Sequence, residues 1–128
     1  MTEMKVLLWP SLAGQEIAAR LRKIHGAKTV IVESIEQLAA AAEDAEVLVI
    51  GGHFFGARVA GVLREQAKRL RFVQSITAGY EGIQAHGVPP GVVVANAGES
   101  WSPGVAEHGM ALLLALTKRL PQYVANQA

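Results

Sequence analysis

Short apolar runs rich in Val, Leu and Ile alternate along this chain with stretches that carry a helical period. This alternation is typical of βαβ units, in which parallel strands form a central sheet and helices cover its faces. It predicts five strands, at Lys5–Trp9, Thr29–Val32, Glu46–Ile50, Phe72–Ile76 and Val92–Ala95. The third run is continuously apolar, which favours a strand that is covered on both faces. The 128 residues suffice for one such domain.

Two helices are expected in the first half of the chain. Three large aliphatic residues have the spacing of one face of a helix at about 14–25, namely Ile17, Leu21 and Ile24. Gly26 follows them and can adopt the left-handed conformation that ends a helix. Ser34 and Gln37 form a capping-box pattern, which predicts a second helix to about Asp44 because both side chains can satisfy backbone donors at its start.

A third helix is expected to bury an apolar face formed by Val59, Val62, Leu63 and Leu70. The most basic surface of the chain lies on its other side, at Arg58, Arg64, Lys68, Arg69 and, just beyond, Arg71. No aromatic residue is interleaved there and Glu65 lies among them, so a solvated helix face is favoured over an anion site. The formal net charge of +1 also argues against a nucleic-acid-binding protein, because such proteins usually carry a strongly basic face.

The final helix, expected at 102–120, is apolar around most of its circumference. Ser102 should cap it, and Pro103 suits its first position because the N–H that proline lacks would be unsatisfied there. Its large apolar residues are Val105, Met110, Leu112, Leu113, Leu114, Leu116 and Leu120. One sheet face does not need so much apolar surface, so a second burial partner is expected, either another domain or another subunit. Residues 121–128 are expected to begin a linker.

Several classes of protein and site are excluded by what the sequence lacks. Without cysteine the chain has no disulfide, thiolate nucleophile or Cys-based metal site, and a cytoplasmic location is expected. The N-terminus lacks the pattern of a secretory signal, and the longest apolar run, Gly109–Leu116, is too short to span a membrane. No G-x-G-x-x-G, Gly-Lys-Ser/Thr, His-Glu-x-x-His or Gly-x-Ser-x-Gly motif occurs. Hydride or phosphoryl transfer would therefore need another polypeptide segment, and no metal site is expected.

Three loops after predicted strands are the best candidates for a ligand site, because ligands of parallel α/β proteins bind beyond the carboxyl ends of the strands. Residues 51–56 include His53 and Phe54, which could form one wall. Residues 77–82 contain two glycines that could turn successive N–H groups toward an anion. Residues 96–102 lead into the final helix, whose dipole also favours negative charge. Together the loops suggest a small anionic ligand, although each loop taken singly is more often a simple turn, and a lone loop His more often a surface residue.

Three motifs in residues 70–120 have a familiar order: Thr77-Ala78-Gly79-Tyr80-Glu81, then Val92-Val93-Val94, then Ser102-Pro103-Gly104-Val105-Ala106-Glu107-His108. In this order they resemble the N-terminal half of the D-isomer-specific 2-hydroxyacid dehydrogenases, within the formate and glycerate dehydrogenase-like superfamily. The resemblance implies a flavodoxin-like five-stranded parallel sheet with helices on both faces in residues 1–101. It also implies a long apolar interdomain and dimerisation helix at 102–120. The sequence departs from the family pattern at Glu81, Gly82 and Trp101, which leaves the substrate open.

The resemblance also implies a function. In the whole enzyme, hydride passes between NAD or NADP and a small 2-hydroxy or 2-keto acid, and this chain would be the substrate-binding half. The Rossmann domain, which carries the glycine motif and the catalytic Arg, Glu and His, is expected to lie beyond Leu120. The chain alone is therefore expected to contain no catalytic residue, to bind no cofactor and to be inactive. The alternative is a stand-alone flavodoxin-like module that binds small carboxylates, or dimerises, without catalysis.

The resemblance implies site residues as well. Substrate binding is assigned to the backbone N–H groups of Ala78, Gly79 and Tyr80 and to a wall formed by His53 and Phe54. The cofactor side is assigned to Trp101, Ser102 and Val105. The expected partners are a 2-hydroxy or 2-keto acid, the missing Rossmann domain, and a second copy of the chain bound through the final helix, with neither nucleic acid nor membrane.

Overall fold

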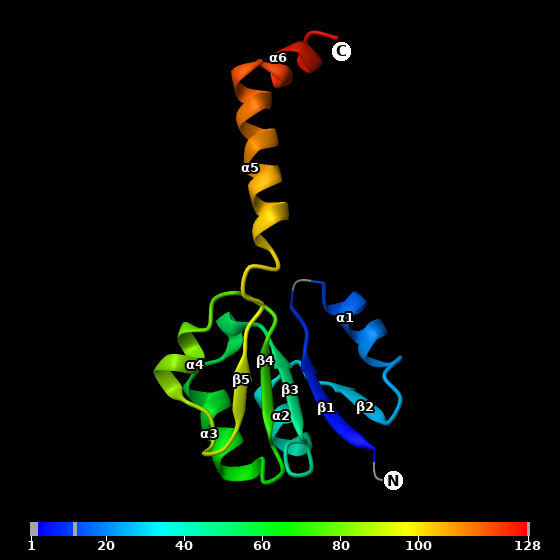
Figure 1. The fold of residues 1–128 in the computed structure, drawn as a ribbon, viewed down its shortest axis with the longest axis vertical. Coiled ribbons are helices and arrows are strands. Elements are labelled where there is room, and N and C mark those ends of the chain that lie inside the picture. The colour runs from blue at the N-terminus through cyan, green and yellow to red at the C-terminus, as the bar shows by residue number, and fades with distance from the viewer. Residues whose placement is uncertain (1–2, 12, 128) are drawn as a thin grey trace. The chain divides into compact units, whose positions relative to one another are not determined.

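The structure is a computed structural model that describes residues 3–11 and 13–127. It divides into two compact units, Met1–Ala97 and Gly98–Ala128, each described here by itself. The elements of the first unit are, in chain order, β1 (Met4–Trp9), α1 (Gly14–Leu21), β2 (Ala27–Ile31), α2 (Ile35–Ala41), β3 (Val47–Ile50), a 3-10 turn (Gly52–Phe54), α3 (Ala57–Gln66), β4 (Phe72–Ser75), α4 (Glu81–His86) and β5 (Val93–Ala95) (Figure 1).

The five strands form one parallel sheet in the order β2-β1-β3-β4-β5. This is the flavodoxin-like order, and the predicted α/β fold is confirmed. The register places Trp9 beside Ile50 and Ile50 beside Ser75, so β1, β3 and β4 reach the same edge of the sheet. The strand order reverses between β1 and β3, and ligands of such sheets bind near this switch point.

Both faces of the sheet carry helices, as predicted. On one face, α2, α3 and α4 contribute Leu38, Val59, Leu63 and Ile83 to a core with Leu7, Leu48, Ile50 and Val73 from the strands. On the other face, α1 packs Ile17, Ala18 and Leu21 against Val6, Leu8 and Val49. Alternate residues of β1 and β3 therefore belong to different cores, as the two-residue period of a strand requires.

Helix α1 is shorter than predicted. It ends at Leu21, and Ile24, which was expected on its buried face, is 49% exposed. Gly26 has the expected positive φ of 80°, but it lies in the turn before β2, where its carbonyl accepts a hydrogen bond from the Met4 N–H. The turn begins before Ile24 and removes that residue from the helical register.

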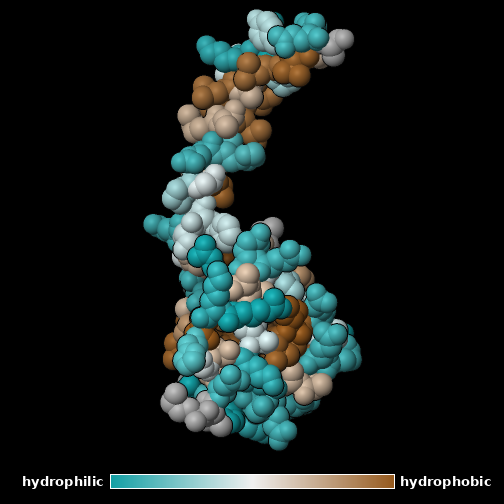
Figure 2. Space-filling view, turned by 90° about the vertical axis from the view of Figure 1, so that its right-hand side faces the viewer, coloured by the Kyte–Doolittle hydropathy of each residue, from teal (hydrophilic) through white to brown (hydrophobic). Residues whose placement is uncertain are grey.

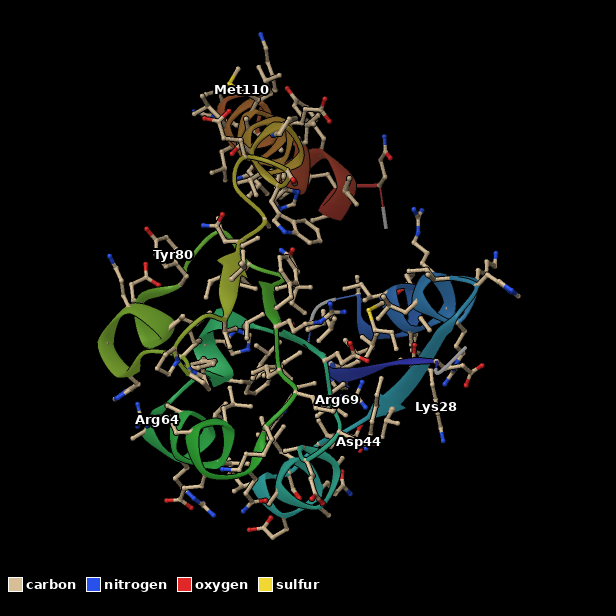
Figure 3. All side chains as sticks on the ribbon, turned by 60° about the horizontal axis from the view of Figure 1, so that its bottom comes forward. Lys28, Asp44, Arg64, Arg69, Tyr80 and Met110 are labelled. Atoms are coloured by element: carbon tan, nitrogen blue, oxygen red, sulfur yellow. The ribbon has the colours of Figure 1, made fainter. Side chains whose placement is uncertain are left out.

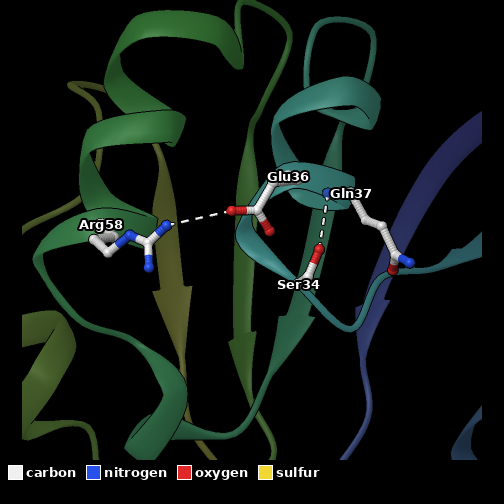
Figure 4. Close-up of polar contacts among 4 residues, drawn as sticks. All are labelled: Ser34, Glu36, Gln37 and Arg58. Carbon is white, nitrogen blue, oxygen red and sulfur yellow. Dashed lines mark hydrogen bonds and ion pairs between the residues drawn. The ribbon is translucent and has the colours of Figure 1, made fainter.

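Helix α2 begins as its sequence predicts. The Ser34 hydroxyl accepts a hydrogen bond of 3.2 Å from the Gln37 N–H, as Figure 4 shows. The Gln37 side chain accepts from the N–H of Glu33, one residue before the position that a capping box would use. The helix ends at Ala41, three residues before the predicted end.

The second unit contains α5 (Ser102–Thr117) and α6 (Leu120–Ala125). The prediction that Ser102 caps α5 is wrong: Trp101 occupies the N-cap position without a side-chain cap bond, and Ser102 is the first helical residue. Arg119, with φ of 52°, separates the two helices, and α6 lies in the segment expected to begin a linker.

Helix α5 is exposed along its length within the described chain, apart from the half-buried Ala115. Figure 2 shows hydrophobic surface gathered on its carboxyl-terminal half. The predicted apolar residues account for this surface, with exposures from 50% at Leu120 to 69% at Leu116. No helix of the described residues is both long enough and apolar enough to cross a membrane.

Candidate functional site

Two loops meet through their backbones at the carboxyl edge of the sheet, one after β3 (residues 51–56) and one after β4 (77–82). The Gly52 N–H donates to the Thr77 Oγ1 atom at 3.0 Å. A Cβ atom on Gly52 would lie 2.2 Å from the Gly79 carbonyl oxygen, and one on Gly82 would lie 2.0 Å from that of Phe55. Only glycine permits so close an approach. The structure thus joins two of the three loops that the sequence indicated.

The carbonyl groups of the second loop are held by the protein. The Thr77 carbonyl accepts from the Ala97 N–H at 3.2 Å and lies 3.1 Å from the Ser75 hydroxyl. The Ala78 carbonyl accepts from the Asn96 side chain at 2.7 Å. The Gly79 carbonyl accepts from the Thr77 hydroxyl at 2.9 Å. Three successive peptide planes are therefore fixed.

The N–H groups that follow these carbonyls are Ala78, Gly79 and Tyr80, the three expected to hold a carboxylate. All peptide bonds described are trans, so each N–H points opposite to the carbonyl of the preceding residue and away from the group that holds it. None of the three meets an acceptor within the described part of the chain. They lie within about 7 Å along the backbone. This succession of donors can meet the oxygens of a small anion.

Gly79 is not among the glycines of positive φ. A Cβ atom on Gly79 would lie 2.8 Å from Oε2 of Glu81, the end of a flexible side chain that can move aside. The carboxylate of Glu81 therefore lies close beside the loop backbone, and it adds negative charge next to the unpartnered donors.

The first loop supplies an aromatic wall. Phe54 stacks on Trp9, with ring centroids 5.9 Å apart, and the His53 ring lies 4.2 Å from that of Phe54. Phe54 is 41% exposed, and His53 is also exposed. Close by, the buried Ser11 hydroxyl has no partner in the described chain and lies 3.0 Å from where a Cβ of Gly51 would be. The wall thus has one orphaned polar atom, which suits a ligand or a bound water.

A cavity of about 290 Å³ lies between Tyr80 of the 77–82 loop and the end of β5. Tyr80, Val94, Ala95 and Asn96 line it, and Tyr80 is 40% exposed at the start of α4 (Figure 3). A larger cavity of about 530 Å³ lies between α1 and β2, away from this loop, and includes Arg22 and Glu33 among its lining residues. Of these two cavities, the smaller one includes Tyr80 of the 77–82 loop in its lining.

The four arginines of the basic surface around α3 contact acidic or carbonyl groups. Arg58 contacts Glu36 at 3.4 Å, while Arg69 and Arg71 contact Glu46 at 3.4 and 2.8 Å. Arg64, labelled in Figure 3, donates to the His86 carbonyl at 2.8 Å. These contacts favour the interpretation of a solvated helix face.

The residues expected on the cofactor side, Trp101, Ser102 and Val105, all lie in the second unit and are exposed. Their role stays a prediction. Among the described residues, no group of three or more His, Cys, Asp or Glu side chains is arranged to hold a metal ion.

Sequence reasoning missed the residues that hold the site together. Ser75, Thr77 and Asn96 fix the loop carbonyls, while Trp9 and Ser11 complete the wall. Each of these residues lies at or just after the end of a strand. Polar and aromatic residues at the ends of predicted strands could therefore have indicated them from the sequence.

No protein-family model and no curated protein matches this chain. Among solved structures, it is similar to the crystal structure of a D-isomer specific 2-hydroxyacid dehydrogenase family protein from Aeromonas salmonicida subsp. salmonicida. The TM-score is 0.72 at 20% sequence identity, over 98% of this chain but 39% of that one. The likeness shows the fold. The protein with the similar structure is from the family that the sequence resembles. This chain spans well under half of that protein's length.

Proposed function

We propose that this chain is the substrate-binding part of an NAD(P)-dependent D-2-hydroxyacid dehydrogenase. The observation that carries the proposal is the run of three N–H donors at Ala78, Gly79 and Tyr80. The carbonyl of the residue before each donor accepts a hydrogen bond, and the three N–H groups meet no acceptor in the described chain. The structural likeness to a protein of this family supports it. The ligand is a small 2-hydroxy or 2-keto acid whose carboxylate accepts from these donors.

The role of the chain in such a reaction is to bind and orient the acid. Fixed backbone donors need no reorganisation when the carboxylate binds, so they hold the adjacent C2 carbon in a defined position. His53 and Phe54 form the wall against the remainder of the substrate. The nicotinamide cofactor supplies or accepts the hydride, and a dinucleotide-binding segment outside these residues is required for it.

The affinity of the chain alone should be weak. Hydrogen bonds to a charged group contribute about 1.5–3 kcal/mol each, and association costs at least about 4 kcal/mol. Three such bonds therefore leave at most a few kcal/mol, and about 4 kcal/mol corresponds to a dissociation constant of about 1 mM. Binding is expected at millimolar concentration or above.

The test is a titration of the ¹⁵N-labelled chain with pyruvate, followed by backbone amide resonances. The Ala78, Gly79 and Tyr80 amides should shift saturably, and pyruvamide, which has the same shape without the charge, should not shift them. Pyruvate that shifts other amides, or none, would contradict the proposal. Reduction of a 2-keto acid by the purified chain with NADH would also contradict it, because the chain is expected to be inactive alone.

A stand-alone carboxylate-binding module is the second candidate, because all three donors and the groups that hold their carbonyls lie within the first unit. Such a module would have to bind a small carboxylate tightly without contacts from another domain. Calorimetry with glyoxylate, pyruvate or hydroxypyruvate distinguishes the two. A dissociation constant well below about 1 mM favours the module.

A further inference from the structure

One hydroxyl group links the two loops of the candidate site. The Thr77 Oγ1 atom accepts a hydrogen bond from the Gly52 N–H at 3.0 Å and donates to the Gly79 carbonyl at 2.9 Å. Gly52 begins the turn that carries His53 and Phe54, and Gly79 precedes the Tyr80 N–H. The hydroxyl thus connects the wall of the site to its donors.

One assignment of the hydroxyl protons gives each of them an acceptor. A hydroxyl has one proton, and because Thr77 Oγ1 accepts from the Gly52 N–H, its own proton is free to go to the Gly79 carbonyl. The Ser75 hydroxyl, which is fully buried, lies 3.1 Å from the Thr77 carbonyl, 3.1 Å from Thr77 Oγ1 and 3.2 Å from the Gly79 carbonyl, and it can donate its own proton to the Thr77 carbonyl. Both hydroxyl protons have acceptors in this assignment. The result is a directed chain from Gly52 N–H through Thr77 Oγ1–H to the Gly79 carbonyl.

We infer that Thr77 is a positioning residue, whose hydroxyl holds the Gly79–Tyr80 peptide with its N–H directed toward a bound carboxylate. This rests on the proposed function, since it names how the same site is kept ready for its ligand. Gly79 has no Cβ atom to restrict its backbone, so its orientation depends on the hydrogen bonds it makes. A hydrogen bond to the carbonyl also polarises the peptide, which strengthens the Tyr80 N–H as a donor.

Replacing Thr77 by Val removes the hydroxyl and keeps the shape of the side chain. The Gly52 N–H then loses its acceptor, and the Gly79 carbonyl loses the shorter of its two contacts with a hydroxyl and keeps the Ser75 hydroxyl at 3.2 Å. Thr77→Ser keeps the hydroxyl. Thr29→Val is the matched control, because the Thr29 hydroxyl is also buried but has no partner in the described chain, and Thr29 lies in β2 away from the loop.

The experiment compares the ¹⁵N-labelled wild type and these three variants, first without ligand and then with pyruvate. In T77V the Gly52 and Tyr80 amide resonances should move without ligand, and the dissociation constant for pyruvate should rise at least about fivefold, the effect of one lost hydrogen bond. T77S and T29V should bind within about twofold of the wild type, a difference smaller than that bond.

The possible results separate this inference from the proposed function. If the wild type binds pyruvate at residues 78–80 and T77V binds it equally well, the inference is overturned and the proposed function stands. If the wild type does not bind, both fail. If T77V does not fold, T77S decides: a folded T77S that loses pyruvate binding overturns the role of the hydroxyl, and one that keeps it supports that role.

Discussion

Two glycines let the loops after β3 and β4 touch through their backbones. Gly52 lies against the carbonyl of Gly79, and Gly82 against that of Phe55. Glycines after the strands indicated both loops, as backbone that could approach a ligand or turn N–H groups toward an anion. Each of the two contacts that require them joins residues 27 positions apart. A local sequence pattern does not reveal contacts between such distant residues.

Gly82→Ala should destabilise the chain although alanine is the better helix former. Alanine in place of glycine stabilises a helix interior by about 1 kcal/mol, but the new Cβ atom would lie 2.0 Å from the Phe55 carbonyl oxygen. Relieving such overpacking typically costs about 1–3 kcal/mol. We expect a net loss in the free energy of unfolding, measured by urea denaturation.

Gly61→Ala is the control for this change. Gly61 lies in α3, and a Cβ atom there would meet nothing within 4 Å. This variant should gain about 0.5–1 kcal/mol. If both substitutions changed the free energy of unfolding equally, the close approach of Gly82 to the Phe55 carbonyl would not contribute to stability.

At the scale of elements, the strands were easier to predict than the helices. All five strands lie within two residues of their predicted starts, because each contains a short run of β-branched or other apolar residues. Helix α4 was missed altogether: it has six residues, has no side-chain cap and begins in a glycine-containing loop. The ends of α1 and α2 were placed too late, since helix ends depend on turns whose sequence signals are weak.

The start of α2 makes the stability sensitive to acid. The pKa of the Glu36 carboxyl is lowered from its ordinary value of 4.5, first by a backbone hydrogen bond, then by the Ser34 hydroxyl, with Arg58 adding to the effect (Figure 4). The pKa of Asp44 is lowered chiefly by its hydrogen bond to Lys5. Groups whose pKa is lower in the folded state stabilise it above their unfolded pKa, and this contribution is lost as pH falls through the folded pKa.

We therefore expect the free energy of unfolding to fall as the pH is lowered from about 6 to about 3. Glu36→Gln should reduce this dependence on pH, and Asp44→Asn should do the same. Glu65→Gln serves as the control, because Glu65 has no ion pair in the part of the chain that the structure describes. Urea denaturation across this range measures the effect. If the free energy of unfolding of Glu36→Gln depended on pH as strongly as that of the wild type, the carboxylate at the start of α2 would not contribute to the acid sensitivity.

At the scale of the whole molecule, α5 has the largest unexplained apolar surface. Its large residues are more than half exposed, including Val105 at 68% and Leu116 at 69%. An isolated helix of this length is only marginally stable in water. The composition of the helix predicted this surplus of apolar surface. The surface that packs against it could not be predicted, because the periodicity of one helix does not specify its partner.

We expect the purified chain to be a dimer or larger at micromolar concentration, with α5 buried between copies. Leu112 and Leu116 lie four positions apart on one face of the helix. Replacing both by Gln should lower the mass measured by light scattering and reduce the helical signal in circular dichroism. Ala111→Gln, on the same helix, should change neither. A monomeric wild type would contradict this expectation.

The central claim is that the N–H groups of residues 78–80 hold the carboxylate of a small acid. A crystal structure of the chain with pyruvate bound tests it most directly. The account predicts carboxylate oxygens at about 2.9 Å from the backbone nitrogens of Ala78, Gly79 and Tyr80, with the Gly79 carbonyl still bonded to the Thr77 hydroxyl. Pyruvate bound instead in the cavity between α1 and β2, with these nitrogens unoccupied, would contradict it.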